Sequence, residues 1–139
     1  IEDDKVHFSH DELRILMYAK LGREDVWEFM LGLLYSKNSS MHIYTKNSVQ
    51  IRLNEERLHH ILINHPEMIE FIKDIPKIMN DPDKIFQGEK QEYIAIKSRK
   101  HFFLVVIYRE EFEDGFIITA FKARSIGYLL KRKLLWQKQ

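Results

Sequence analysis

Two hydrophobic periods divide the chain. From residue 9 to residue 79 the apolar positions recur mainly every three or four residues, which indicates amphipathic helices. From residue 92 onward the period changes to two, and the segments 92–98, 102–110 and 115–123 are typical of strands joined by short polar turns. Helices first and a meander last predict an α+β fold that ends in an antiparallel sheet.

The helical part contains a linker-like stretch. Ser9 and Glu12 have the spacing of a capping box and predict the start of the first of two helices within residues 9–35. Residues 36–40 (SKNSS) are the most linker-like segment of the sequence. We therefore expect an N-terminal helical extension over residues 1–40 and a main domain over residues 41–139.

The main domain should begin with two short strands and two helices. The segments MHIYT and VQIRL alternate as strands do, and Asn54 is a suitable N-cap for the helix that follows. Pro66 disfavours helical geometry at His65, so this helix should stop or bend there. A further helix is expected over residues 67–79.

Composition changes this picture only through the distribution of charge. The 139 residues include 22 basic and 21 acidic side chains and no cysteine, which excludes disulfides and thiolate metal sites. No apolar run approaches the roughly 18 residues of a membrane span, and no signal peptide is visible, so we expect a cytoplasmic protein. Residues 84–139 carry 12 basic and 6 acidic side chains, which is typical of an anion-binding surface or of a solvated face.

Histidines on the predicted helix are the strongest candidates for chemistry. His60 lies in a polar row with Arg57 and Asn64, beside the apolar stripe of the helix, and His65 ends it. A histidine near a sheet that carries cations and Thr119 could remove the proton of a ribose 2′-hydroxyl without a metal. Alternatively, His65 is a core or capping residue and Thr119 simply packs in its strand.

The histidine spacing does not favour a metal. His60 and His65 are five positions apart rather than four, and the sequence holds no HExxH motif. We therefore expect neither a metal nor a cofactor.

An ordered set of short motifs spans residues 54–136. It comprises His60-Ile61, His65-Pro66-Glu67, Ile75 to Ile78, Pro82-Asp83 with Ile85, Leu104-Val105-Val106, Ile117-Ile118-Thr119-Ala120-Phe121 and Leu134-Leu135-Trp136. Through the order and spacing of these motifs the chain resembles the phage-associated nucleases of the barnase–EndoU–colicin–RelE-like superfamily. The resemblance covers about 80 residues of the main domain.

The resemblance implies a curved antiparallel sheet of four or five strands, with helices on one face and RNA on the other. It implies metal-independent cleavage of RNA, as in toxins or phage-related effectors. His60, His65 and Thr119 occupy the matching site positions. The side chains expected to hold phosphate are Arg57, Lys97, Arg109, Lys122 and Arg124.

The sequence thus predicts an endoribonuclease that uses histidine, with RNA such as tRNA as substrate and an antitoxin or immunity protein as a possible partner. A non-catalytic module that binds RNA or protein with the same sheet is the alternative. A structural protein whose N-terminal helices form an interface is a third reading.

Overall fold

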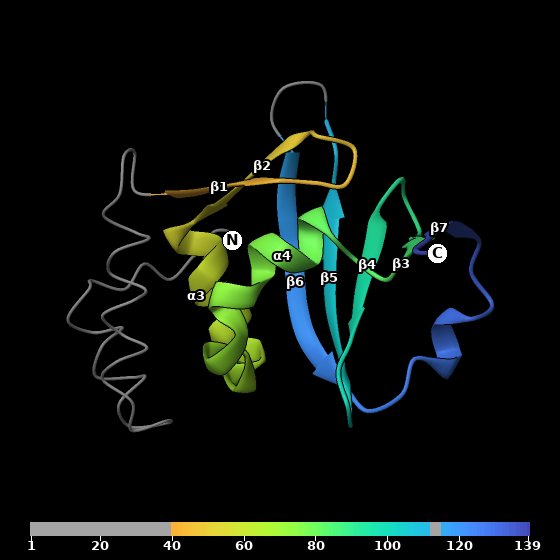
Figure 1. The fold of residues 1–139 in the computed structure, drawn as a ribbon. Helices are drawn as coiled ribbons and strands as arrows, with labels where there is room; N and C mark the ends of the chain where they lie inside the picture. Colours follow the sequence, from red (N-terminus) through yellow and green to blue (C-terminus); the bar gives the residue numbers. More distant parts are fainter. Residues whose placement is uncertain (1–39, 112–114) are drawn as a thin grey trace.

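The computed structural model describes residues 40–111 and 115–139, which form an α+β fold (Figure 1). The sequence predictions for residues 9–35 lie outside this part of the chain. No helix within it is long and apolar enough to cross a membrane. The elements, with η for 3-10 helices, are β1 (Ser40–Tyr44), β2 (Gln50–Asn54), α3 (Glu55–Asn64), η2 (Pro66–Asp74), α4 (Ile75–Asn80), β3 (Lys84–Gln87), β4 (Tyr93–Ser98), β5 (Phe103–Arg109), β6 (Gly115–Ala123), η3 (Gly127–Leu129) and β7 (Leu134–Gln137).

One seven-stranded sheet in the order β1-β2-β6-β5-β4-β3-β7 organises the fold. The expected meander is confirmed, since β4, β5 and β6 pair antiparallel within a residue or two of the predicted bounds. The expectation of four or five antiparallel strands is wrong, because β2 pairs parallel with β6. Two four-residue strands, β3 and β7, extend the other edge.

The sheet is strongly curled. β1 and β7 lie at its two ends, yet Lys46, in the turn after β1, places its Nζ 4.8 Å from the centroid of the Trp136 ring in β7. The β1–β2 hairpin therefore crosses in front of the upper end of the sheet (Figure 1). Its turn is held by Glu110, whose carboxylate accepts hydrogen bonds from the buried Thr45 hydroxyl at 2.6 Å and from Asn47 Nδ2 at 3.2 Å.

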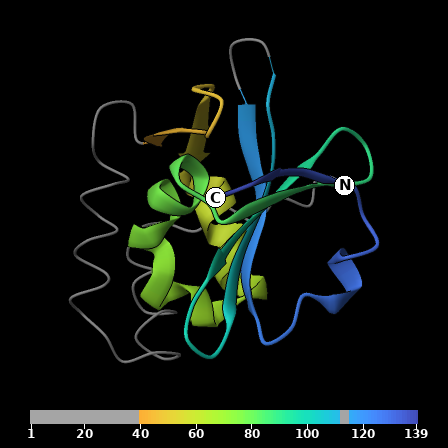
Figure 2. The same cartoon turned by 45° about the vertical axis from the view of Figure 1, so that its right-hand side comes forward.

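The two faces of the sheet carry different cores. Residues that pair across antiparallel strands share a face of the sheet, so the register assigns each paired side chain of the meander to one face. The helix face holds the larger cluster, which includes Leu104, Val106 and Tyr108 of β5 packed under the helices. The opposite face holds a smaller cluster closed by Ile126 and Leu129, next to and within η3. Figure 2 shows the helices and η3 on opposite sides of the sheet.

The segment between α3 and β3 is not the single α-helix that the pattern predicts. It consists of η2 followed by the short helix α4, and the Ile75 N–H donates to the carbonyl of Ile72. Pro76 accounts for the difference, because it has no N–H and its ring would collide with that carbonyl in a continuous α-helix. Pro66 acts as expected, since α3 ends at Asn64.

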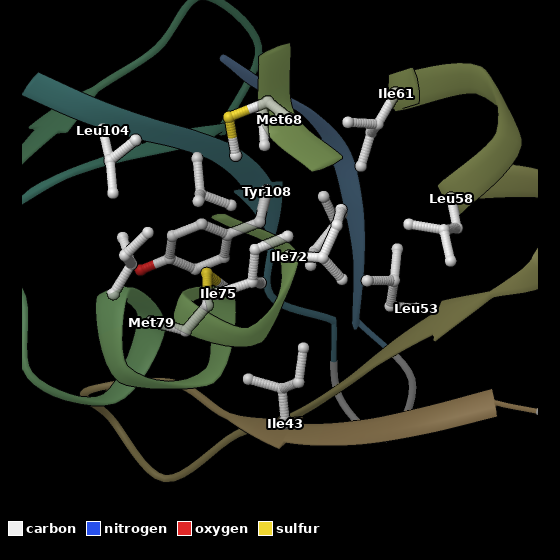
Figure 3. Packing of buried hydrophobic residues seen from close by; sticks show 14 of the residues in the cluster. Ile43, Leu53, Leu58, Ile61, Met68, Ile72, Ile75, Met79, Leu104 and Tyr108 are labelled. Atoms are coloured by element: carbon white, nitrogen blue, oxygen red, sulfur yellow. The ribbon is translucent and has the colours of Figure 1, made fainter. Parts of the chain in front are cut away.

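Tyr108 brings a hydroxyl into the apolar core. Its ring lies among Ile72, Ile75 and Met79 in Figure 3, fully buried, and its hydroxyl oxygen has no hydrogen-bond partner among the described residues. Burial, together with the nearby charge of Glu110, raises the pKa of this phenol, so the group stays neutral.

Tyr108→Phe is therefore expected to raise the free energy of unfolding, by about 1 kcal/mol, because a buried polar group without a partner is destabilising. Urea denaturation measures the change. The matched control is Tyr93→Phe, whose ring stacks on that of Tyr108 from a half-buried position and whose change should be close to zero. A destabilisation of Tyr108→Phe would show that the hydroxyl is hydrogen-bonded in solution.

Candidate functional site

Helix α3 lies against β6 and positions the polar row predicted from the sequence. Its buried stripe of Leu58, Ile61 and Leu62 faces the core. Arg57 stands at the edge of this stripe, with its guanidinium carbon 5.3 Å from the centroid of the Phe116 ring. His60 is exposed one turn later, and its backbone carbonyl accepts a hydrogen bond from Asn64 Nδ2 at 3.0 Å. The row therefore lies along the border between α3 and the sheet.

His65 connects α3 to η2 and reaches the sheet. Its backbone N–H donates to the Ile61 carbonyl at 2.7 Å, and its own carbonyl accepts from Met68 at 2.9 Å, so its backbone is fixed at both ends. The ring centroid lies 5.4 Å from that of Phe121 in β6. Nδ1 is 3.8 Å from a carboxylate oxygen of Glu67, and the side chain is 34% exposed. This histidine thus lies against a ring and near a carboxylate, and one-third of its side chain is open to solvent.

Thr119 and Arg109 share the opposite face of the sheet. Thr119 pairs with Ile107, and Arg109 pairs with Phe116, so these side chains leave the sheet away from the helices. The ladder shifts between Ile107 and Tyr108, which places one extra residue in β6 beside Thr119. Both Thr119 and Arg109 are half-buried, and the Arg109 guanidinium lies 3.3 Å from the carboxylate of Glu111.

These groups form a strip along β6, which we call the β6 strip. At one end the Arg57 guanidinium lies on the Phe116 ring, and Phe116 pairs with Arg109 in the ladder; at the other end the His65 ring lies against Phe121, and Thr119 comes between the two phenylalanines along β6. Because a strand rises about 3.3 Å per residue, Thr119 is about 7 Å along the strand from Phe121. The strip therefore combines a histidine, a hydroxyl and two guanidinium groups along one strand. Its residues are Arg57, His65, Arg109, Phe116, Thr119 and Phe121.

The remaining predicted residues lie elsewhere. Lys97 of β4 and Lys122 of β6 both pair with Leu104 of β5, so both side chains are on the helix face. Lys122 rests its Nζ 4.6 Å from the centroid of the Phe102 ring. Arg124 is exposed just after β6, and His60 is exposed on α3, three residues after Arg57. The structure thus brings Arg57 to the Phe116 ring and His65 to the Phe121 ring, on strand β6 that also carries Thr119, and it places Lys97 and Lys122 on the helix face.

Lys97 has a structural environment. Its Nζ donates to the Asp81 carbonyl at 2.8 Å and lies 3.6 Å from carboxylate oxygens of both Asp81 and Asp83. Lys138 joins the same cluster, and its hydrogen bond with the Asp81 carboxylate lowers the pKa of that group. Lys97 therefore ties the end of α4 to β4, and Lys138 ties the segment after β7 to the same cluster.

Two aromatic residues of the strip, Phe116 and Phe121, were not predicted as site residues. The sequence contains the information in part, because alternation places Phe121 on the same face as Thr119. The extra residue in β6 interrupts the alternation before Phe116, so its face could not be read from a strict period of two.

Comparisons with known proteins add no identification. No protein-family model matches the chain, and no curated protein or solved structure matches it. Among residues 40–111 and 115–139, no three histidine, aspartate or glutamate side chains gather in a way that could hold a metal ion.

Proposed function

We propose that this protein is a metal-independent endoribonuclease whose active site is the β6 strip. The observation that carries the proposal is the position of His65. Its ring packs on Phe121 at the sheet face that also bears Thr119, while the Glu67 carboxylate lies near its Nδ1. A histidine with one nitrogen oriented by a carboxylate can exchange a proton with a substrate through the other nitrogen.

The proposed reaction is an internal transesterification of RNA. A base removes the proton of the 2′-hydroxyl, the 2′-oxygen attacks the adjacent phosphorus, and the bond to the 5′-oxygen breaks. The leaving oxygen takes a proton from an acid, which gives a 2′,3′-cyclic phosphate and a 5′-hydroxyl. His65 and the exposed His60 are the proposed base and acid, in either order.

Charge stabilisation is assigned to the other members of the strip. The phosphorane carries extra negative charge on its non-bridging oxygens, and donors fixed before the reaction stabilise that charge best. Thr119 offers a hydroxyl donor, while Arg57 and Arg109 offer guanidinium groups that can contact phosphate through two N–H groups. Phe116 and Phe121 hold Arg57 and His65 in place through their rings.

The biological setting is proposed from the sequence resemblance. An enzyme of this kind would act on cytoplasmic RNA, with tRNA as a first substrate to test, as a toxin or phage-related effector. An antitoxin or immunity protein would then be its partner.

The test is cleavage of tRNA and of total RNA by the wild type in the presence of EDTA. We expect products with 2′,3′-cyclic phosphate ends, no cleavage where the scissile 2′-hydroxyl is replaced by hydrogen, and loss of activity in a His60→Ala/His65→Ala double variant. His101→Ala is the matched control, because His101 is an exposed histidine in the turn between β4 and β5 and is not part of the β6 strip. Equal activity in the wild type and the double variant would refute the assignment.

The alternative is a module that uses the same strip to bind RNA without cleaving it. It is favoured by one observation, namely that the cation–ring contact at Phe116 supplies binding groups that do not involve histidine. Salt-dependent RNA binding by a wild type that leaves every phosphodiester intact would support this alternative, since contacts with phosphate weaken steeply with salt.

A further inference from the structure

The segment that follows β6 continues the surface of the β6 strip. Ala123, the last residue of β6, pairs with Phe103 and so lies on the same face as Thr119 and Phe121. The chain then turns into η3, which packs on that face through Ile126 and Leu129. Figures 1 and 2 show this segment leaving the lower end of β6 and running along the side of the sheet away from the helices.

This segment exposes an aromatic ring between cations. Tyr128 in η3 is 58% exposed, although tyrosine normally buries much of its ring. Arg124 and Lys131 on either side of it are exposed as well. The hydrogen bonds from Leu129 to Ile126, from Leu130 to Gly127 and from Arg132 to Leu129 make successive turns of three residues. Tyr128 and Lys131 are three positions apart in this series, which is the spacing that brings side chains to one side of a 3-10 turn.

The charges around Tyr128 favour an anion. From Phe116 to the C-terminus the sequence has six basic residues and no acidic one. The Glu89 carboxylate lies 3.5 Å from the Arg132 guanidinium, so this ion pair involves Arg132 and not Arg124 or Lys131. An exposed ring with flanking cations is the arrangement that binds a single-stranded nucleic acid, by stacking on bases and by attraction to phosphates.

We propose that Arg124, Tyr128 and Lys131 form a second RNA-binding site that holds nucleotides flanking the scissile bond. This second site rests on the proposed function, because cleavage at the β6 strip is what places the RNA along β6. The substrate class is then single-stranded RNA several nucleotides long. A double helix does not fit this role, because its bases are already stacked on each other and offer no free face to Tyr128.

The experiment measures binding of a fluorescein-labelled 12-mer of 2′-O-methyl uridine, which cannot undergo the transesterification, and of the corresponding trimer. Tyr128→Ala is expected to weaken binding of the 12-mer about tenfold and to leave the trimer unchanged. Lys131→Ala is expected to lower the salt slope of the 12-mer affinity by about 0.7. Thermal melts establish that both variants are folded.

Two controls are matched by residue type and exposure. Tyr44→Ala removes a tyrosine that is 54% exposed in β1, and Lys77→Ala removes an exposed lysine from α4, on the helix side. Neither should alter the affinity. Equal affinities of Tyr128→Ala and Tyr44→Ala for the 12-mer would overturn the proposal, as would absence of binding by the wild type; in either case a protein partner becomes the better occupant of this segment.

The outcome is separable from that of the proposed function. A wild type that binds the 12-mer through Tyr128 but leaves unmodified RNA intact would support the second site and refute cleavage. If the wild type cleaves RNA but Tyr128→Ala binds the 12-mer as tightly as the wild type does, cleavage is supported and the second site is refuted.

Discussion

His65→Ala is expected to lower the rate constant of RNA cleavage by about 10²- to 10⁴-fold, the range typical of a lost general acid or base. The fold should survive, because the side chain is one-third exposed and the contacts that join α3 to η2 are made by the backbone of residue 65. The loss should appear in kcat with little change in KM, since proton transfer matters in the transition state rather than in substrate binding. Single-turnover cleavage of a short fluorescent RNA measures both.

Neighbouring variants distinguish catalysis from simple disruption of the strip. Glu67→Gln keeps the size of the side chain that faces Nδ1 but removes its charge, so its loss should be smaller, about tenfold, and should change the pH profile. Thr119→Val replaces the hydroxyl by a methyl group of similar shape and should act on kcat through the lost donor. If His65→Ala cleaves as fast as His101→Ala, His65 has no catalytic role.

Gly115→Ala is expected to lower the free energy of unfolding by about 1–3 kcal/mol, since overpacking a filled site forces backbone shifts. A Cβ atom at this position would overlap Ile51 Cδ1 and lie 2.5 Å from the Arg109 carbonyl oxygen. Ile51 and Gly115 are also paired in the short parallel ladder between β2 and β6. The variant should therefore displace β2 and, with it, the helix that carries Arg57 and His65.

Gly127→Ala is the matched control for this substitution. Neither glycine has a left-handed φ, but a Cβ at position 127 would meet only the Ser125 hydroxyl, at an ordinary 3.6 Å. This change should be neutral or stabilise by about 0.5 kcal/mol, because alanine restricts the unfolded chain. Urea denaturation and RNA cleavage of both variants give the comparison. A Gly115→Ala protein as stable as Gly127→Ala would mean that the close contact with β5 relaxes without cost.

The local elements could be predicted because local rules determine them. Alternation located β4, β5 and β6, and the two prolines near the end of α3 and in α4 mark boundaries that follow from the missing N–H. The break at Pro76 follows from the same rule, although the apolar pattern alone predicts one continuous helix. By contrast, β3 and β7 are only four residues long, too short for periodicity to identify them.

The non-local features could not be read from a single sequence. Whether β2 lies beside β6 depends on packing between distant segments, and this pairing determines which face receives Arg57 and His65. The separation of the predicted phosphate-binding cations onto two faces also depends on strand pairing. Lys97 and Arg109 are both cations of the meander, but the register sends Lys97 to the acidic cluster at the end of α4 and Arg109 to the β6 strip.

The pairing of β2 with β6 also has a kinetic consequence. The contact between Thr45 and Glu110, which anchors the β1–β2 hairpin near this ladder, joins residues 65 positions apart. Contacts between such distant residues carry the largest entropy cost of loop closure, and they form late in folding. The meander can form from local hairpins, but α3 reaches its place only when this closure is complete. RNA binding at the β6 strip should therefore appear in the last phase of refolding, after the meander has formed.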